Sequence, residues 1–451
     1  MLDAASYGRL AVGISEHGAF EQRGEGVPPS PQPATNYSPG LPLLVAGIYE
    51  LSGGERERPA RLALALLGTL AVLFAYLIGR RLAGTEAGIV GALGVAVYPA
   101  FLEYQGMLMT EPLAATLLSG GVLAVLWANG PRDQASPARV LSRGKGVLAK
   151  NQAAPPPLPL GRTHTTGDLA PSLPRPGVPF RYLLPGVLLG ATAMVRPEYL
   201  GIAVLIAVVV AVRQGRGGLR SCGVQAVVML LGVVIVVAPW TVRNAVVLDR
   251  FVPLSTGGGQ VLFAGNYLPS DGDPQRVGEE VLERNLGIRA RLAAEQRAAG
   301  SAEPPTLERI LAALAAKRHP GTETDVALRR MGRDQLWRNM RERPLEVAEF
   351  TAVKVGRVWG RGPREVMTKP VWAIWHAAIV ALGLFGLGLL AWRRRWEALL
   401  FGAILLAVTL LSALLVASPR RVLVVMPLVS ALAGYGAASL TRRWRRSAPA
   451  R

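Results

Sequence analysis

The stretch Arg61–Ile78, RLALALLGTLAVLFAYLI, carries no charge after its first residue. A helix of about 20 predominantly apolar residues crosses the hydrocarbon core of a bilayer. Comparable runs recur along the chain and predict an all-α polytopic membrane protein with about nine transmembrane helices. The predicted crossings are Arg61–Ile78, Ala87–Phe101, Pro112–Trp127, Tyr182–Val195, Tyr199–Val212, Gly223–Trp240, Val371–Trp392, Ala398–Val416 and Val422–Leu440.

The composition argues against a soluble enzyme and against a nucleic-acid-binding protein. Of the 451 residues, 51% are hydrophobic, which is too high for an ordinary soluble domain. The net charge of +20 comes from short Lys and Arg clusters between apolar runs, a pattern typical of membrane orientation signals. The lone Cys222 excludes an internal disulfide, and without a Cys pair a zinc site is not expected. We expect no metal and no cofactor.

A basic cluster follows every second predicted crossing, so all the clusters lie on one side of the membrane. By the positive-inside rule that side is cytoplasmic. The opening stretch and the large polar region before the last three crossings then lie outside. The predicted organisation begins with an outer first loop with amphipathic surface helices (1–54), transmembrane helices (55–128) and a Pro-rich cytoplasmic linker (129–181). Further transmembrane helices (182–240), a large outer region (241–369), the last transmembrane helices (370–441) and a basic cytoplasmic tail (442–451) follow.

The outer segments have different predicted structures. Met1–Phe20 mixes apolar and polar positions, which predicts a helix on the membrane surface ended by His17-Gly18. Asp249–Asp273 has the Gly and Pro content of loop and short strand, whereas Val277–Val358 is charged and helix-like. The large region is therefore expected to be α or α+β.

The amino terminus poses a topological problem. Charged residues interrupt it, so it is not expected to be a signal peptide. With about nine crossings, Met1 lies outside and nothing carries it across. This predicts a first transmembrane helix missing before Met1; alternatively, the short outer segment is translocated unaided.

Two acidic residues lie at the predicted outer rim. Asp3 precedes Tyr7 by one helical turn on the same face. Glu111, followed by Pro112, stands where a crossing begins. On residue type alone, Asp3 could be a solvated cap near a chain end, and Glu111 a carboxylate favoured by a helix amino terminus.

Arginines lie on the same side, where the positive-inside rule does not place them. They are Arg196 in a turn between two apolar helices, Arg243 just past a crossing, and the pair Arg420-Arg421 before the last crossing. A guanidinium at headgroup level suits a phosphate, because its planar fork donates two parallel hydrogen bonds. Snorkelling to lipid headgroups is the alternative for each one taken singly.

Several motifs in order resemble those of a known family. They are Asp3-x-x-x-Tyr7, Asn36-Tyr37-Ser38-Pro39-Gly40-Leu41-Pro42, Leu108-Met109-Thr110-Glu111-Pro112-Leu113, Val195-Arg196-Pro197-Glu198, Pro239-Trp240-Thr241-Val242-Arg243-Asn244 with Val252-Pro253-Leu254-Ser255-Thr256, and Arg420 to Pro427. The set resembles family 39 glycosyltransferases, the protein-mannosyltransferase-like and aminoarabinose-transferase-like members of the GT-C superfamily. The chain departs from the family in the missing first crossing, the long Pro-rich insert and the absence of an acidic neighbour after Asp3.

The resemblance implies an inverting glycosyltransferase, transferring a hexose or pentose from a polyprenyl-phosphate donor. It implies that Asp3 is the catalytic carboxylate, with Glu111 assisting. Substrate-binding residues on the same basis are Tyr7, Arg196, Arg243, Asn244, Arg420 and Arg421. The acceptor would be a lipid, glycan or protein of the cell envelope. The Ala- and Arg-rich usage indicates a bacterial source, and the expected location is the cytoplasmic membrane, with the active site outside.

A transporter or flippase for a lipid-linked sugar is the alternative from another class. It should carry charges near the bilayer midplane and paired broken helices. Here the charges lie at helix ends, which favours the transferase. A non-catalytic membrane assembly protein is a third reading if the chain is truncated.

Overall fold

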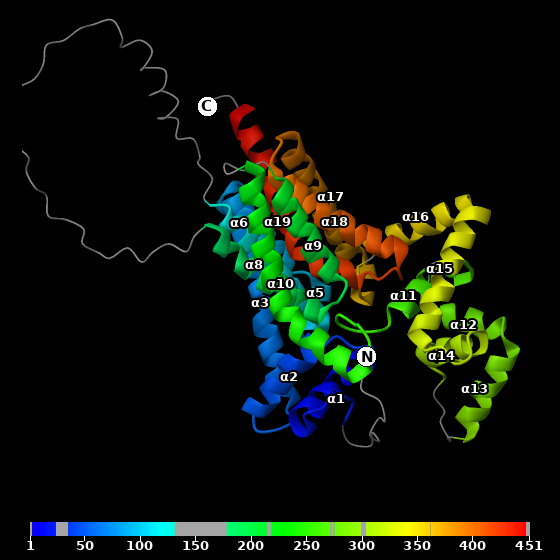
Figure 1. Ribbon diagram of the computed structural model, residues 1–451. Helices are drawn as coiled ribbons and strands as arrows, with labels where there is room; N and C mark the ends of the chain where they lie inside the picture. Colours follow the sequence, from blue (N-terminus) through cyan, green and yellow to red (C-terminus); the bar gives the residue numbers. More distant parts are fainter. Residues whose placement is uncertain are drawn as a thin grey trace, which may run out of the picture.

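The computed structural model describes residues 2–23, 35–130, 178–213, 218–270, 273, 276–298, 304–360 and 362–447. All regular elements of these ranges are helices (Figure 1). They form a long bundle and a smaller group of helices beside one end of it. The all-α fold class is therefore confirmed. The predicted Pro-rich linker lies mostly outside the described residues.

Six helices of this part of the chain are long and apolar enough to cross a membrane. A bent pair, α4 and α5, with 60° between the two helices, brings the count to seven if it is one span. Two apolar helices, α8 and α9, are shorter, so the predicted count of nine is not confirmed. The long helices are α3 (Glu57–Ala83), α6 (Thr110–Ala128), α10 (Gly218–Leu248), α17 (Pro370–Trp392), α18 (Trp396–Leu414) and α19 (Arg420–Ser447), and the others are α4 (Thr85–Ala96), α5 (Pro99–Gln105), α8 (Leu183–Val195) and α9 (Tyr199–Val212).

The break between α4 and α5 interrupts the crossing predicted over Ala87–Phe101, so this segment is either one broken span or a re-entrant loop. Pro99 opens α5, and proline has no backbone N–H to continue a helix from the preceding turn. Tyr98 before it is extended, with φ −80° and ψ 108°. The apolar run continues through the break, so composition alone does not reveal it.

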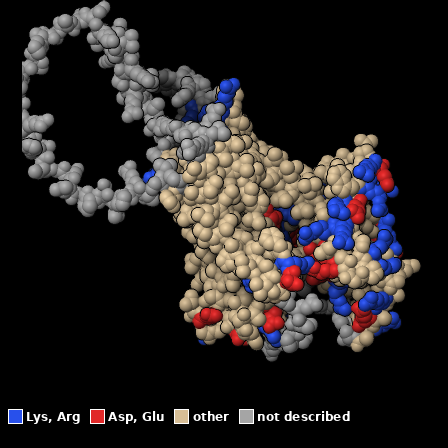
Figure 2. Space-filling view, viewed as in Figure 1, with Lys and Arg blue, Asp and Glu red and all other residues tan. Residues whose placement is uncertain are grey.

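Two helices form the centre of the bundle. In both α6 and α19, 89% of the most apolar 18-residue stretch is buried inside the protein, against 33% in α3 and 28% in α17. Helices α3 and α17 therefore present apolar side chains to lipid, and Figure 2 shows the uncharged flank of the bundle. Glycines allow close packing: a Cβ on Gly434 of α19 would lie 2.1 Å from the Ala87 carbonyl oxygen of α4.

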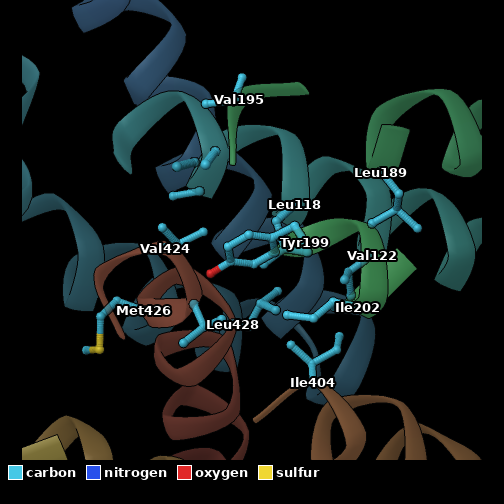
Figure 3. Packing of buried hydrophobic residues seen from close by; sticks show 14 of the residues in the cluster. Leu118, Val122, Leu189, Val195, Tyr199, Ile202, Ile404, Val424, Met426 and Leu428 are labelled. Carbon is cyan, nitrogen blue, oxygen red and sulfur yellow. The ribbon is translucent and has the colours of Figure 1, made fainter. Parts of the chain in front are cut away.

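The buried core continues to the end of the bundle at which α6, α9 and α19 begin. Tyr199, at the start of α9, is 2% exposed and lies between Leu118 of α6 and Val424 of α19 (Figure 3). Its hydroxyl donates to the backbone carbonyl of Arg421 at 3.5 Å. This core fixes the ends of α6, α9 and α19 relative to one another.

Basic side chains hold the helix ends together at one end of the bundle. Arg81 donates to the Gly130 carbonyl, Arg395 to the Leu82 carbonyl at 3.3 Å, and Arg442 to the Ala83 carbonyl. This is the end at which the carboxyl terminus lies in Figure 1.

Two short helices cover the opposite end, α1 (Leu2–His17) and α2 (Gly40–Leu51) (Figure 1). Gly18 ends α1 with φ 64°, a conformation that glycine adopts without strain, so the predicted helix and its stop at His17-Gly18 are confirmed. The first residue of α2 packs against the last turn of α8, because a Cβ on Gly40 would lie 2.8 Å from the Val195 backbone nitrogen.

The region between α10 and α17, predicted to lie outside the membrane, has a hydrophobic core of its own, around Val277, Leu311 and Leu328. Within the described ranges it is helical, as predicted for Val277–Val358. Its helices are α11 (Gly258–Gly265), α12 (Arg276–Glu283), α13 (Leu286–Ala298), α14 (Leu307–Arg318), α15 (Thr324–Glu342) and α16 (Pro344–Gly360), with the short 3₁₀ segments η2 (Leu268–Ser270) and η3 (Glu365–Thr368). A third 3₁₀ segment, η1 (Val178–Tyr182), precedes α8 in the bundle.

The short strand expected within Asp249–Asp273 is absent from the described part of that segment. Side chains, not a partner strand, satisfy its backbone carbonyls: Asn244 Nδ2 donates to the carbonyls of Val252 and Leu254, both at 3.0 Å. The following Gly257 adopts φ 100° and caps α11. The carboxylate of Asp325 accepts the backbone N–H groups of Gly257 and Gly259 at 2.8 Å each. The glycine run therefore begins α11: Gly257 is its N-cap, and Gly258 and Gly259 are its first two residues.

Candidate functional site

A hollow of about 220 Å³ opens at the end of the bundle that α1 and α2 cover. Four segments far apart in the sequence form it with α1: the loop before α2, the start of α6, the turn between α8 and α9, and the start of α19. Its lining residues are Tyr7, Ser38, Met109, Thr110, Glu111, Val195, Arg196, Pro197, Glu198, Ser418 and Arg420.

Glu111 forms the inner wall of this hollow. It lies in the first turn of α6 and is 1% exposed. The partial positive charge of a helix amino terminus stabilises a carboxylate there. Burial of a carboxylate is costly unless cations pair with it, and two arginines do so. The structure thus accommodates both interpretations of Glu111, the helix-terminal carboxylate and the site residue.

Arg196 connects two carboxylates. Its Nε and Nη2 lie 2.9 and 2.8 Å from Oε1 of Glu198, and its Nη1 lies 3.3 Å from Oε1 of Glu111. Burial alone would lower the pKa of Arg196, but Glu198 and Glu111 outweigh it and hold that pKa above its ordinary value. Burial would likewise raise the pKa of the Glu198 carboxyl, but Arg196 and Arg421 lower it. Both groups are therefore charged at neutral pH.

The two arginines that begin α19 point to different neighbours. Arg420 lines the hollow, with Nη1 3.9 Å from Oε1 of Glu111 and its guanidinium carbon 5.9 Å from the centre of the Tyr104 ring. Arg421 is more buried, donates to the Val416 carbonyl and has Nε 3.9 Å from Oε1 of Glu198. The predicted arginine pair is thus divided between the wall of the hollow and the layer beneath it.

Two buried guanidinium nitrogens retain unused donor capacity. Nη1 of Arg196 and Nε of Arg421 make no hydrogen bond with any described residue, although each lies within ion-pair distance of a carboxylate. A buried donor without an acceptor costs roughly 1–3 kcal/mol. Arg196 is one of the residues that line the hollow. A bound anion such as a phosphate would supply the missing acceptor.

Tyr7 of α1 reaches the hollow, and its ring meets that of Tyr37 edge-on at 5.6 Å between centres. Asp3 stands one turn earlier in α1, but its side chain lies outside the described residues. Its position on α1 is compatible with the predicted meeting of Asp3 and the arginines. That meeting stays a prediction.

Arg243 and Asn244 do not line the hollow. The Arg243 guanidinium stacks over the rings of Trp240 at 4.8 Å and Phe20 at 5.7 Å, and its Nη1 donates to Asn244 Oδ1 at 3.1 Å. Asn244 in turn binds the carbonyls after α10, as described above. In this structure the two residues fasten the chain segment after α10 to the end of that helix.

Glu198 is a site residue that the sequence reasoning did not single out. Its acidic side chain is two residues from Arg196, in a Pro-containing turn on the same rim as Glu111. That spacing is a usable signal, because a carboxylate beside a rim arginine fixes its orientation. Ser38, Thr110 and Ser418 carry no comparable signal. In the described part of the chain, no group of three or more His, Cys, Asp or Glu is placed to hold a metal ion.

Comparisons with known proteins bear on the fold. Residues 33–159 match the model of the dolichyl-phosphate-mannose-protein mannosyltransferase family. No curated protein matches the chain.

Solved structures of low sequence identity match nearly the whole chain. The oligosaccharyltransferase AglB of Archaeoglobus fulgidus, in complex with an inhibitory peptide and a dolichol-phosphate, is 14% identical, with a TM-score of 0.51 over 100% of this chain and 48% of that one. The same enzyme tethered to an acceptor peptide gives 12% identity, a TM-score of 0.52, and 98% and 46% coverage. ArnT of Cupriavidus metallidurans, bound to undecaprenyl phosphate, gives 15% identity, a TM-score of 0.36, and 98% and 73% coverage.

The chain spans about half the length of AglB. The resemblance expected from the ordered motifs is confirmed at the level of the structural class. The chain therefore has the fold of the GT-C membrane glycosyltransferases, and its residues 33–159 match the protein-mannosyltransferase family of that class.

Proposed function

We propose that the chain is an inverting glycosyltransferase that takes a sugar from a polyprenyl-phosphate donor at the hollow lined by Tyr7, Glu111, Arg196 and Arg420. One observation carries the proposal: a buried guanidinium with an unused donor lines a hollow at the membrane rim. The AglB structure with the same fold holds a dolichol-phosphate, a lipid phosphate of the kind proposed.

The donor phosphate lies between Arg196 and Arg420. Each guanidinium can donate to the phosphate oxygens, and Arg196 is oriented for this by its two bonds to Glu198. As the bond from the sugar carbon C1 to the phosphate oxygen breaks, its electron pair passes to that oxygen. Fixed cations that face the developing charge stabilise the transition state more than the ground state.

Asp3 acts as general base in this mechanism. The acceptor hydroxyl oxygen attacks C1 from the face opposite the phosphate, which inverts the configuration, and the hydroxyl proton passes to the Asp3 carboxylate. Tyr7, one turn away in α1, contributes a hydroxyl to the same hollow. Glu111 acts as a positioning residue, because it pairs with Arg196 and lies near Arg420.

The active site is assigned to the extracytoplasmic side of the cytoplasmic membrane. The arginines that tie the helix ends, Arg81, Arg395 and Arg442, lie at the bundle end opposite the hollow. Short basic segments of this kind stay in the cytoplasm. A secreted or lipid-bound acceptor of the cell envelope is then accessible, and a hexose or pentose is the expected sugar.

The distribution of charge favours a transferase over a transporter. The buried charged residues of the described helices that span the bilayer, such as Glu111, Glu397 and Arg421, lie at helix ends. A transporter places ionisable groups near the midplane, where they bind substrate and coupling ion.

The test uses the full chain in proteoliposomes with a panel of polyprenyl-phosphate sugars and membrane-derived acceptors. We expect release of polyprenyl phosphate together with a glycosylated acceptor for at least one donor. Movement of an intact lipid-linked sugar across the bilayer, without cleavage, would instead establish a flippase. The absence of both reactions from the whole panel would remove the proposed function.

A further inference from the structure

A second cavity, of about 450 Å³, lies in the outer region. Residues of α11, α12, α14 and α15 surround it, together with the chain just after α11 and α12. None of its lining residues belongs to the hollow at the membrane rim. Figure 2 shows that these outer helices carry most of the charged side chains on the visible face.

The cavity has an apolar floor with two aromatic rings. Phe263 and Tyr267 lie 5.6 Å apart between ring centres and are inclined by 32°. Val281, Leu314 and Met331 complete the apolar surface. Such a floor offers flat contact area to the apolar face of a ring-shaped ligand.

Three arginines stand around this floor: Arg284, Arg318 and Arg338. Nε of Arg284 lies 3.4 Å from Glu280. Arg318 and Arg338 form no ion pair with the described residues. All three side chains are exposed to solvent, so their guanidinium groups are free to turn toward an anionic ligand and donate charge-assisted hydrogen bonds to it.

Groups that bind hydroxyls line the same cavity. The amides are Asn285 and Gln335, anchored by bonds from Asn285 Nδ2 to the Val281 carbonyl at 2.9 Å and from Gln335 Nε2 to the Asn266 carbonyl at 2.5 Å. Asp334 adds an exposed carboxylate, whose Oδ1 accepts hydrogen bonds from Arg333 at 3.4 Å and whose second oxygen can accept from a hydroxyl.

We propose that this cavity binds an acidic saccharide, a glycan whose sugars carry carboxylate groups. The aromatic floor takes the sugar ring, Asp334 and the two amides take hydroxyls, and Arg318 with Arg338 takes the carboxylate. The amides and the carboxylate can bind the polar groups of a saccharide or of a peptide, so the two aromatic rings of the floor, which offer a flat surface to a sugar ring, favour the saccharide.

The cavity is connected to the hollow through α14. At the start of this helix Glu308 accepts a hydrogen bond from Asn36 at 3.2 Å, and the loop of Asn36 continues to Ser38 in the hollow. Arg318 ends α14, about 15 Å along the helix axis from Glu308 at 1.5 Å per residue. A saccharide of several rings can span a distance of this order, from Arg318 to the end of α14 that contacts Asn36. Its role as the acceptor rests on the proposed function, whereas its binding does not.

The binding test uses the purified full chain in detergent and tri-galacturonate as the probe, with isothermal titration calorimetry as the measurement. The variant Arg318→Gln with Arg338→Gln is expected to raise the Kd about tenfold or more, because two charge-assisted bonds are lost. The matched control, Arg289→Gln with Arg330→Gln, removes the same charge from exposed positions outside the cavity and should leave the Kd unchanged. Equal thermal unfolding midpoints would confirm that all three proteins are folded.

Two comparison ligands make the test decisive. The methyl ester of tri-galacturonate, which has no charge, should bind at least about tenfold more weakly than the acid. Hexaglutamate that binds as tightly as tri-galacturonate would overturn the saccharide assignment in favour of an acidic peptide. Undetectable binding of tri-galacturonate, or an equal loss of binding in the control variant, would overturn the site itself.

The acceptor role is measured separately, by transfer to an acidic oligosaccharide. We expect the Arg318/Arg338 variant to raise the acceptor KM and to leave the donor KM unchanged. An unchanged acceptor KM in an active enzyme would overturn the acceptor role alone. If the wild-type protein transfers no sugar, the proposed function fails and the calorimetric result still decides whether the cavity binds.

Discussion

Nη1 of Arg196 lies 3.3 Å from Oε1 of Glu111 without forming a hydrogen bond to it, while Nε and Nη2 of the same guanidinium are bound to Glu198. One edge of the guanidinium is therefore fixed by Glu198. The remaining nitrogen, Nη1, lies within ion-pair distance of Glu111 but does not donate a hydrogen bond to it. This arrangement makes the site sensitive to anions, and the first two predictions follow from it.

Glu111→Gln should destabilise the protein and make its stability respond to phosphate. The variant removes a buried carboxylate that balances Arg196 and Arg420, and we expect a loss of roughly 1–3 kcal/mol in the free energy of unfolding. Inorganic phosphate should restore more of the thermal unfolding midpoint in this variant than in wild type, because it can occupy the lost charge position.

Glu103→Gln is the matched control. Glu103 lies at the same end of the bundle and pairs with Arg364, outside the hollow. Phosphate should not restore the stability of this variant selectively. An equal phosphate response of both variants would show that the effect is one of general ionic strength.

Removing the two guanidinium groups of the hollow should weaken donor binding. Arg196→Gln or Arg420→Gln is expected to raise the Kd for undecaprenyl phosphate by about tenfold or more, since a charged hydrogen bond contributes about 1.5–3 kcal/mol. Arg196→Lys should not restore binding fully, because an ammonium lacks the planar fork that engages Glu198 and a phosphate together.

The control for this series is Arg394→Gln, an exposed arginine between α17 and α18 at the opposite end of the bundle. Its Kd should equal that of wild type. A weakening as large as that of the Arg420 variant would mean that undecaprenyl phosphate responds to overall charge and not to this hollow.

Asp3→Asn should abolish most of the sugar transfer while donor binding persists. General base catalysis contributes about 10²–10⁴-fold, so we expect a loss of kcat in that range with the Kd for the donor little changed. Glu16→Gln changes an exposed carboxylate of the same helix and should retain full turnover. Wild-type turnover in Asp3→Asn would remove Asp3 from the mechanism.

Much of the bundle could be predicted from the sequence, because a long apolar run has few alternatives to crossing a membrane. The convergence of Glu111, Arg196 and Arg420 could also be anticipated, since the alternation of basic clusters places all three on one rim. The bend before Pro99 was not apparent in the hydropathy pattern, whereas the short lengths of α8 and α9 match the predicted segments Tyr182–Val195 and Tyr199–Val212. A helix of 13 residues, such as α8, rises only about 20 Å, and sequence does not show how the bundle accommodates it.

The parts of the site that sequence could not place depend on tertiary contacts. Arg243 has the same composition signal as Arg196, a cation beside a crossing, but the rings of Phe20 and Trp240 hold its guanidinium in the structure. The carboxylate of Asp325, in α15, accepts the backbone N–H groups of Gly257 and Gly259 at the start of α11. Partners this distant in sequence are not specified by any local pattern.

Asn244→Ala should affect stability more than donor binding. The amide of Asn244 donates to two buried carbonyls. Its loss leaves the Val252 carbonyl unpaired at a cost of roughly 1–3 kcal/mol, whereas the Leu254 carbonyl keeps its bond from Trp240 Nε1 at 2.8 Å. Circular dichroism should therefore show a lower thermal unfolding midpoint, while the Kd for undecaprenyl phosphate changes little. A tenfold weaker Kd with an unchanged midpoint would return Asn244 to the substrate-binding set predicted from sequence.

Lys354 should make the stability of the protein depend on pH. It is 1% exposed, and its Nζ donates to the carbonyls of Gly265 and Ala413, both at 2.6 Å, where α11 meets the end of α18. Burial, and secondarily the charge of Arg421, lowers the pKa of Lys354 from 10.5 to about 7. Between these two values the unfolded chain binds the proton and the folded chain does not.

The sign of the effect follows from this difference in bound protons. Because the unfolded state binds more protons, the free energy of unfolding rises with pH from about 7 to about 10, by up to about 1.4 kcal/mol per pH unit. Lys354→Met lacks the titrating group, so its thermal unfolding midpoint should rise less over the same range. Lys369→Met, an exposed lysine before α17, should retain the wild-type slope. If the slopes of wild type and Lys354→Met coincide, Lys354 keeps its proton in the folded protein, and its two carbonyl bonds outweigh the cost of burying the charge.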